Sequence, residues 1–323
     1  MNEWEVRRWM RKTFSKHGWA LLIYYLLMSA TVTCACLAEA LFAVSFDILS
    51  GNWARVFLNF LPAFSNAVAT NGWGYILAIV IGAGIMFLWK GKSFCIREIW
   101  HCNKSLTPSN FAGFLLLMVA TQAVFQMIAI LMNWLFSLFG ISVLGSVNAA
   151  TGIGDTLSMF LYGCIFGPIG EEILFRGLMM RSFQPFGKKF AVFASAFLFA
   201  IFHGNIVQTP FAFLAGCILG FVAMEYSLLW AMILHIFNNL VLGDILPRLL
   251  DFLPDLIGTL IFQILIWGCA AASLVFLWIR RDAISAYIRR GKIHPWPMKS
   301  FFSAAGILVM IAIFIMETIF AFF

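Results

Sequence analysis

Nine apolar runs, separated by short polar gaps, divide this chain of 323 residues. By residue number they cover roughly 19–46, 72–89, 111–139, 156–180, 190–204, 210–224, 228–243, 256–279 and 301–323. Several reach the ~20 residues that a helix needs to cross a bilayer, whereas the fifth, sixth and seventh are shorter. Lipid offers no hydrogen bonds to the backbone, so helices rather than open strands are expected. We therefore predict an all-α polytopic bundle of about eight or nine transmembrane helices.

The overall composition supports a membrane protein and argues against a soluble domain. Hydrophobic residues make up 63% of the chain, charged residues only 11%, and the mean hydropathy is +0.95. The net charge of +7 could suggest nucleic acid, but the charges lie in the gaps between apolar runs, as membrane topology places them. The expected surroundings are membrane lipid, and no nucleic-acid partner is expected. The absence of linkers and repeats in the sequence predicts one integral membrane domain over residues 1–323.

The basic residues alternate between gaps in the way that the positive-inside rule requires. With the N-terminus in the cytoplasm, only Arg55 and Arg248 fall on the external side. Arg176 lies within an apolar run, and the internal gaps hold the others: Arg7, Arg8, Arg11, Lys12, Lys16, Lys90, Lys92, Arg97, Lys104, Arg181, Lys188, Lys189, Arg280, Arg281, Arg289, Arg290, Lys292 and Lys299. The turn at Glu225 and Tyr226 has no basic residue, which leaves a count of eight spans open.

Two segments outside these runs have a distinct composition. Residues 1–18 are basic and rich in Trp, which predicts a segment on the cytoplasmic membrane surface before an uncleaved first span. The segment from Ser50 to Gly72 combines aromatic and polar residues, and we expect it to be an external loop that rests on the membrane.

Two adjacent carboxylates and an arginine stand inside the fourth apolar run, at Glu171, Glu172 and Arg176. Ionisable groups at membrane depth are costly, so they mark a functional site by default. Residues four apart share one helix face, which predicts that Glu172 pairs with Arg176. Glu171 then lies ~100° around the helix and is the better candidate for a general base.

Three further polar residues fall at a similar predicted depth. His203 lies ~21 Å from Lys189 along its helix, and His235 and Asn239 lie ~12 and ~18 Å from Ser227. These heights match that of Glu171, so one site could contain all four groups. Each residue also has a structural interpretation: a Glu–Arg pair can clamp helices, and a membrane His or Asn can simply join them. That all four residues fall at one depth favours a functional site. Pro168 and Gly170, just before the two carboxylates, could open the helix to water.

The three motifs together resemble a known family. Glu171-Glu172-x-x-x-Arg176-Gly, preceded by Pro168, is followed by Phe199-x-x-x-His203 and His235-x-x-x-Asn239. This order resembles the CPBP family of type II CAAX prenyl endopeptidases and bacteriocin-processing or Abi proteins. The resemblance covers about residues 160 to 240, within a predicted catalytic core at 156–243.

The resemblance implies an intramembrane endopeptidase whose helices surround a central intramembrane catalytic cavity. In that cavity Glu171 and His203 would activate water, while His235 and Asn239 would bind the oxyanion. Glu172 and Arg176 would support these groups. Two imidazoles and a carboxylate could also hold one zinc ion, and the sequence leaves metal-dependent and glutamate-dependent catalysis open. The implied partner is a peptide or membrane-protein substrate, with or without a lipid. Because Glu171 is nearer the cytoplasmic end of its run, we expect access from that side.

Other functions are less well supported by the sequence. An ion-coupled transporter would favour internal repeats, and none is visible; a non-catalytic scaffold or immunity protein of the same fold remains an alternative. The sequence has no His-Glu-x-x-His or Gly-x-Ser-x-Gly motif, and its Gly-x-Gly-Asp at 152–155 has no Tyr-Asp partner, so Asp155 is interpreted as a helix cap. Glu39 and Glu317 receive no role.

Overall fold

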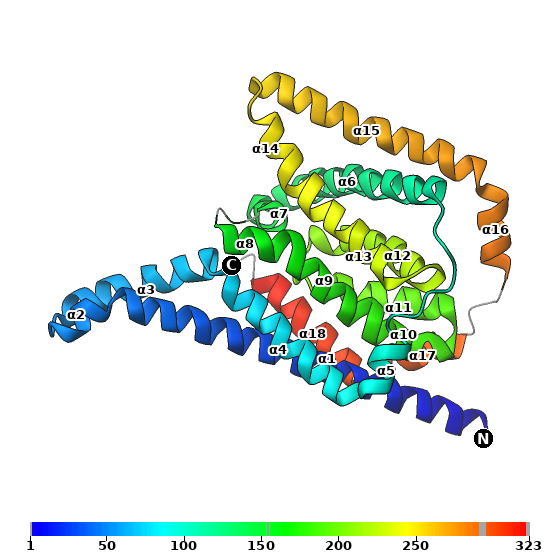
Figure 1. Ribbon diagram of the computed structural model, residues 1–323, viewed down its shortest axis with the longest axis horizontal. Helices are drawn as coiled ribbons and strands as arrows, with labels where there is room; N and C mark the ends of the chain where they lie inside the picture. Colours follow the sequence, from blue (N-terminus) through cyan, green and yellow to red (C-terminus); the bar gives the residue numbers. More distant parts are fainter. Residues whose placement is uncertain (1, 153, 155, 291–294, 321–323) are drawn as a thin grey trace.

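Seven helical segments in the described part of the chain are long and apolar enough to cross a membrane. The computed structural model describes residues 1–323 except 1, 153, 155, 291–294 and 321–323, so Asp155 lies outside the described residues. The seven segments are Glu3–Ala43 (α1), Gly72–Lys90 (α4), Pro108–Ser137 (α6), Leu157–Phe186 (α8 to η3), Gln208–Glu225 (α12), Leu228–Leu250 (α13 to α14) and Asp255–Ile279 (α15). The predicted all-α polytopic bundle is confirmed (Figure 1).

Two of these segments change helix type along their length. The first is built from α8 (Leu157–Leu161), η1 (Tyr162–Phe166), α9 (Gly167–Glu171), η2 (Glu172–Met180), α10 (Arg181–Phe183) and η3 (Gln184–Phe186). The second is built from α13 (Leu228–Ile236), η4 (Phe237–Ile245) and α14 (Leu246–Leu250). The other helices are α2 (Ser45–Leu49), α3 (Trp53–Thr70), α5 (Lys92–Arg97), α7 (Leu144–Thr151), α11 (Lys188–Ile201), α16 (Arg281–Arg289), α17 (Pro295–Phe301) and α18 (Ala305–Phe320).

The number of spans depends on two regions that depart from the predicted runs: helix α11, and the pair of α17 and α18. The run 190–204 becomes α11, which has 14 residues and is too short to be a span by itself. At the C-terminal end, α17 and α18 are bent by 60° relative to each other and count as one more crossing if taken together. The described residues therefore give seven spans, or eight with the bent pair, and the figure of nine included α11.

The N-terminal region is more helical than the sequence suggests. Helix α1 begins at Glu3 behind a capping box formed by Asn2 and Glu5, and it continues for 41 residues without a break. The predicted basic surface segment is thus helical and continuous with the first span, and its place on the membrane surface stays a prediction. The expected external loop after Ser50 is instead mostly helix α3, which runs back beside α1 (Figure 1).

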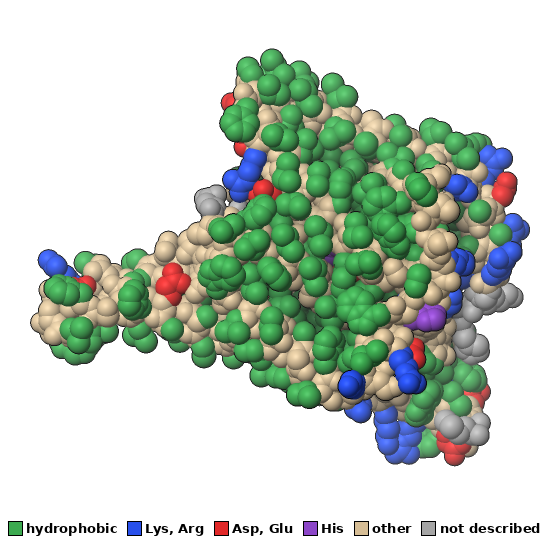
Figure 2. Space-filling model, in the orientation of Figure 1, with side chains coloured by type: hydrophobic (Ala, Val, Ile, Leu, Met, Phe, Trp, Pro, Cys, Tyr) green, Lys and Arg blue, Asp and Glu red, His purple; other side chains and the backbone are tan. Residues whose placement is uncertain are grey.

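The helix that contains both carboxylates occupies the middle of the bundle. In Figure 1, α8 to α10 lie between α4 on one side and α12 and α13 on the other, with α6 and α15 beyond them. The end of α4, the starts of α10 and α11, and the turn between α15 and α16 lie at one end of the bundle in Figure 1. We call it the basic end, because these positions carry Lys90, Arg181, Lys188 and Arg280. Most Lys and Arg visible in Figure 2 gather at this end. We call the other end, which carries α7 and the turn between α14 and α15, the opposite end.

Helices α1 and α18 approach each other through two glycines. A Cβ atom added to Gly18 would lie 2.5 Å from the backbone of Gly306, and one added to Gly306 would lie 2.3 Å from the carbonyl oxygen of Ser15. The Ser15 hydroxyl also accepts a hydrogen bond from the amide of Gly306, at 3.0 Å. Small residues of this kind allow helix backbones to pack closely in a membrane.

Substitution of Gly306 by Ala should destabilise the fold, because the new methyl group has no room against α1. We expect a loss of about 1–3 kcal/mol in the free energy of unfolding, as for other overpacked sites. Gly268→Ala on α15 is the matched control, since a Cβ there meets open space. Thermal unfolding in detergent micelles measures both variants, and equal stability would contradict the close approach.

Candidate active site

A fully buried ion pair lies at the centre of the bundle. Glu172 and Arg176 are both 0% exposed, and Arg176 Nη1 lies 3.0 Å from Glu172 Oε1. Arg176 Nη2 donates to the carbonyl oxygen of Gly216 on α12 at 3.3 Å, and its guanidinium lies 4.1 Å from the ring centroid of Phe199 on α11. A buried charge is tolerated only when it is paired, so the pair fixes η2 against both neighbouring helices.

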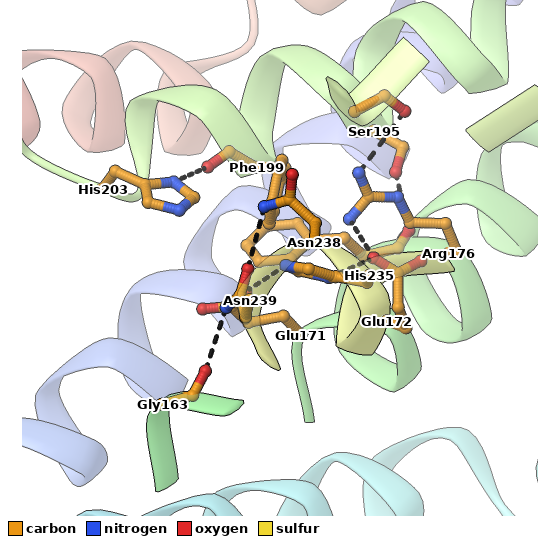
Figure 3. Close-up of polar contacts among 12 residues, drawn as sticks. Gly163, Glu171, Glu172, Arg176, Ser195, Phe199, His203, His235, Asn238 and Asn239 are labelled. Carbon is orange, nitrogen blue, oxygen red and sulfur yellow. Dashed lines mark hydrogen bonds and ion pairs between the residues drawn. The ribbon is translucent and has the colours of Figure 1, made fainter. Parts of the chain in front are cut away.

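His235 on α13 connects this ion pair to the second carboxylate (Figure 3). Its Nδ1 lies 2.9 Å from Glu172 Oε1, and its Nε2 lies 3.6 Å from Glu171 Oε2. An ionised carboxylate only accepts, so Nδ1 carries the hydrogen of the shorter contact. Glu172 therefore fixes the orientation of the imidazole, and Nε2 is the nitrogen that faces Glu171.

The adjacent glutamates have different environments, as the spacing of Glu172 and Arg176 predicts. The side chain of Glu172 is fully buried, while that of Glu171 is 32% exposed and lines a cavity. Glu171 ends α9 and Glu172 begins η2, so the two carboxylates leave the helix in different directions. Of the two, Glu171 is the one that water can reach.

His203 is held in one ring orientation by its own helix. It follows the end of α11, and its Nδ1 lies 2.8 Å from the carbonyl oxygen of Phe199, one turn earlier. Since a carbonyl oxygen only accepts, Nδ1 carries the hydrogen, and in the neutral ring Nε2 is left as an acceptor. The ring of Phe199 also contacts His203 and His235, with centroids 4.7 and 5.7 Å apart.

Asn239 is oriented by a chain of amide hydrogen bonds. Its Nδ2 donates to the carbonyl oxygen of Gly163 at 2.9 Å, and its Oδ1 accepts from Asn238 Nδ2 at 3.0 Å. Asn238 in turn accepts from Gln122 Nε2 on α6 at 2.9 Å. One N–H of Asn239 serves Gly163, so the second is available to another acceptor.

One cavity of about 280 Å³ receives all four predicted catalytic residues, Glu171, His203, His235 and Asn239. From there it extends past Gln208 toward Ala149 and Gly152 at the opposite end. The cavity therefore lies toward the opposite end and away from the basic end, and the expected access from the cytoplasm stays a prediction. The cavity lies there because η1 and the end of α11 leave space at the opposite end, whereas Phe175, Leu178 and Phe183 fill the bundle toward the basic end.

Segments of π-helix surround this cavity. Segments η1 and η4 contribute Tyr162 and Asn239 to its wall, and η2 begins at Glu172, which is buried behind it. A π-helix has a wider turn than an α-helix and often occurs at functional sites. Residues four apart, such as His235 and Asn239, share one face of an α-helix, but this helix changes type at Phe237, between them. Both residues nevertheless line the cavity, because η1 holds Asn239 through Gly163.

The site residues do not form a metal centre in the part of the chain that the structure describes. Among the described residues, no three His, Cys, Asp or Glu side chains are grouped so that they could hold a metal ion. Glu171, His203 and His235 are of suitable chemical type for zinc, but their arrangement does not form a three-ligand site. The described geometry therefore does not fit the zinc centre that the resemblance allows.

Three intramembrane acids lie away from the cavity. Glu317 on α18 accepts a hydrogen bond from the hydroxyl of Tyr25, and Glu39 is exposed on α1. Glu225 at the end of α12 lies 3.3 Å from both Lys104 and Lys188 at the basic end. These contacts give Glu225 and Glu317 structural partners.

Sequence reasoning did not single out Asn238, Gln122 or Tyr162. Asn238 links Asn239 to Gln122 on α6. Gln122 and Gln126 are two polar residues one helical turn apart in an otherwise apolar run, and this pattern could have indicated a polar contact of α6 with the site. Tyr162 lines the cavity beside Glu171, and its position depends on the π-helical turn of η1.

The part of the chain that contains the site matches a known family model. Residues 153–241 match the family model described as type II CAAX prenyl endopeptidase Rce1-like. The match confirms the resemblance to the CPBP family for the central part of the chain, which contains all three motifs. No curated protein and no solved structure matched the chain. The protein is an integral membrane protein with an Rce1-like domain.

Replacement of Arg176 by Leu should be strongly destabilising, because it leaves the carboxylate of Glu172 buried without its cation. We expect the free energy of unfolding to fall by roughly 3–5 kcal/mol. Arg7→Leu is the matched control: Arg7 pairs with Glu3 at the same four-residue spacing but on an exposed surface, and a change of about 0–1 kcal/mol is expected. Similar losses in the two variants would contradict the structural role of the buried pair.

Proposed function

We propose that this protein is an intramembrane endopeptidase that hydrolyses a peptide bond with water activated by Glu171. The observation that carries the proposal is the cavity that contains Glu171, His203, His235 and Asn239, with Glu172 and Arg176 sealed behind it. The match of this region to a family of prenyl endopeptidases supports the same reaction class.

In the proposed reaction, a water molecule binds between Glu171 and Nε2 of His203, which both accept hydrogen bonds. Glu171 takes one proton as the water oxygen attacks the carbonyl carbon of the substrate. The C=O π bond becomes an oxyanion, and the carbon becomes tetrahedral. Collapse of this intermediate breaks the C–N bond, and the proton on Glu171 passes to the departing nitrogen. The products are a carboxylic acid and an amine.

The oxyanion requires hydrogen-bond donors on the other side of the carbonyl group. Asn239 supplies the N–H that Gly163 does not use, and its amide is already oriented by Asn238. His235 in its doubly protonated form donates to Glu172 through Nδ1 and offers Nε2 to the cavity. Donors held in position before the reaction stabilise the developing charge at little cost of reorganisation.

The substrate class follows from the location of the cavity. A site reached within the membrane domain suits a peptide or a membrane-protein segment that becomes extended on binding. A screen with prenylated and unmodified peptides shows whether the substrate segment carries a lipid.

Glu171→Gln should abolish hydrolysis while leaving the fold intact, because Gln retains the shape of Glu but cannot take a proton. We expect a rate loss of ~10²–10⁴-fold, the usual contribution of a general base. The measurement is a mass-spectrometric cleavage screen of prenylated and unmodified peptide libraries with the protein in lipid nanodiscs. Glu39→Gln is the matched control, since Glu39 is exposed on α1 away from the site.

The same screen tests the two oxyanion donors. Asn239→Leu should lower the rate by ~10²–10³-fold, as the loss of one oxyanion donor does in other hydrolases. Processing that continues unchanged in Glu171→Gln and Asn239→Leu would refute the proposed reaction and favour the scaffold function.

The metal question has its own test. Because the described residues form no three-ligand metal site, we propose that hydrolysis proceeds without zinc. Activity should then survive prolonged dialysis against a zinc chelator and should not rise when zinc is added back. Loss of activity on chelation with recovery on zinc addition would establish the metal-dependent alternative.

We further propose that the basic end faces the cytoplasm, in accordance with the positive-inside rule. Cys102 is exposed in the segment between α5 and α6 at that end, so it reports on orientation. A membrane-impermeant maleimide should label Cys102 in inverted vesicles but not in intact cells, with Cys102→Ser as the control. Labelling of Cys102 in intact cells would reverse the orientation.

A further inference from the structure

A second cavity adjoins the catalytic one. It has a volume of about 490 Å³ and shares Ala150, Gln208, Phe211, Asn238 and Asn239 with the catalytic cavity. We call it the annexe, and define it by Gln122, Gln126, Gln208, Asn238, Asn239 and Phe262. It lies between α6, α12, η4 and α15, and Gly243 and Thr151 at its edge are exposed. The annexe therefore adjoins both this exposed edge and the wall of the catalytic cavity.

The lining of the annexe is mainly apolar, and its polar side chains are mostly amides, with no charged residue among them. Gln122 and Gln126 are one helical turn apart on α6, and Gln208 begins α12 on the facing wall. Within the described part of the chain, the carboxamides of Gln126 and Gln208 have no hydrogen-bond partner, whereas that of Gln122 is bonded to Asn238. Both residues are half-buried and line the cavity, so their free amides are accessible to a ligand there.

The chemistry of these amides indicates what the ligand is. A carboxamide donates and accepts at once, which complements the N–H and C=O groups of a peptide backbone and does not select for an ion. An extended segment inside a membrane must find partners for every such group. Phe125, Phe211 and Phe262 supply apolar surface beside the amides, where substrate side chains can be buried.

We infer that the annexe binds an extended segment of the substrate polypeptide through its backbone amides and delivers the next peptide bond to Glu171. This inference rests on the proposed function, since it names the part of the site that holds the substrate. The segment enters from the opposite end, past Ala150 and Gly243, rather than from the basic end. Recognition of the backbone by Gln126 and Gln208 makes binding tolerant of the side-chain sequence.

The experiment measures capture of a probe and requires no turnover. The probe is a ten-residue Ala–Leu peptide with a central benzophenone side chain, and it is cross-linked to the Glu171→Gln protein in nanodiscs. Its matched analogue has N-methylated backbone amides, which removes the backbone donors. We expect cross-links to map to α6 and α7 beside the annexe, and capture to fall by about tenfold for the methylated analogue.

Two variants sharpen the test. Gln126→Leu combined with Gln208→Leu keeps side-chain volume but removes both free amides, and should weaken capture of the unmethylated probe by about tenfold. Gln263→Leu on α15 is the matched control, because Gln263 bonds to Trp267 outside the annexe. Unfolding temperatures confirm that each variant is folded.

The outcomes separate this inference from the proposed reaction. Cross-links in the annexe without any hydrolysis by the unmodified protein would support the binding site and refute the endopeptidase. Hydrolysis with cross-links elsewhere, or with equal capture of the methylated and unmethylated probes, would overturn the annexe. Unchanged capture by the Gln126→Leu, Gln208→Leu variant would also overturn it.

Discussion

The carboxylate of Glu172 is the group on which the rest of the site depends. One of its oxygens contacts both Arg176 Nη1 at 3.0 Å and His235 Nδ1 at 2.9 Å. In water such contacts would contribute little, but this carboxylate is fully buried, and removal of either partner leaves a charge or a polar group unsatisfied. The need to satisfy Glu172 therefore positions α13 against η2, and it leaves Glu171 as the one carboxylate of the pair that faces the cavity.

Irregular helix geometry gives the bundle room for a cavity without losing backbone hydrogen bonds. A membrane-spanning helix must bond its own backbone, so a break in the chain would be costly. The wider turns of η1, η2 and η4 keep the helices continuous while they redirect Tyr162, Glu172 and Asn239. Close contact elsewhere, as between Gly18 and Gly306, holds the surrounding helices in place.

Spacing in the sequence predicted the parts of the site that depend on local helix geometry. The four-residue interval from Glu172 to Arg176 correctly indicated the ion pair, and the depth estimates brought His203 and His235 to the level of Glu171. The π-helical turns were not predictable, because they are stabilised by contacts between helices rather than by a local signal. The hydrogen-bonded amides from Gln122 to Asn239 were not predicted for the same reason. Gln122 and Asn238, which bond to each other, are 116 residues apart in the sequence.

The most direct test of the central claim is the environment of the His235 ring. Solid-state NMR on protein in lipid, with ¹⁵N in the His rings and ¹³C in the Glu carboxylates, measures dipolar couplings between them. The structure predicts couplings from His235 to the carboxylates of both Glu172 and Glu171, stronger at Nδ1 than at Nε2. The assignment is made by loss of one coupling in Glu171→Gln and of the other in Glu172→Gln. A His235 ring with no coupling to either carboxylate would contradict the account.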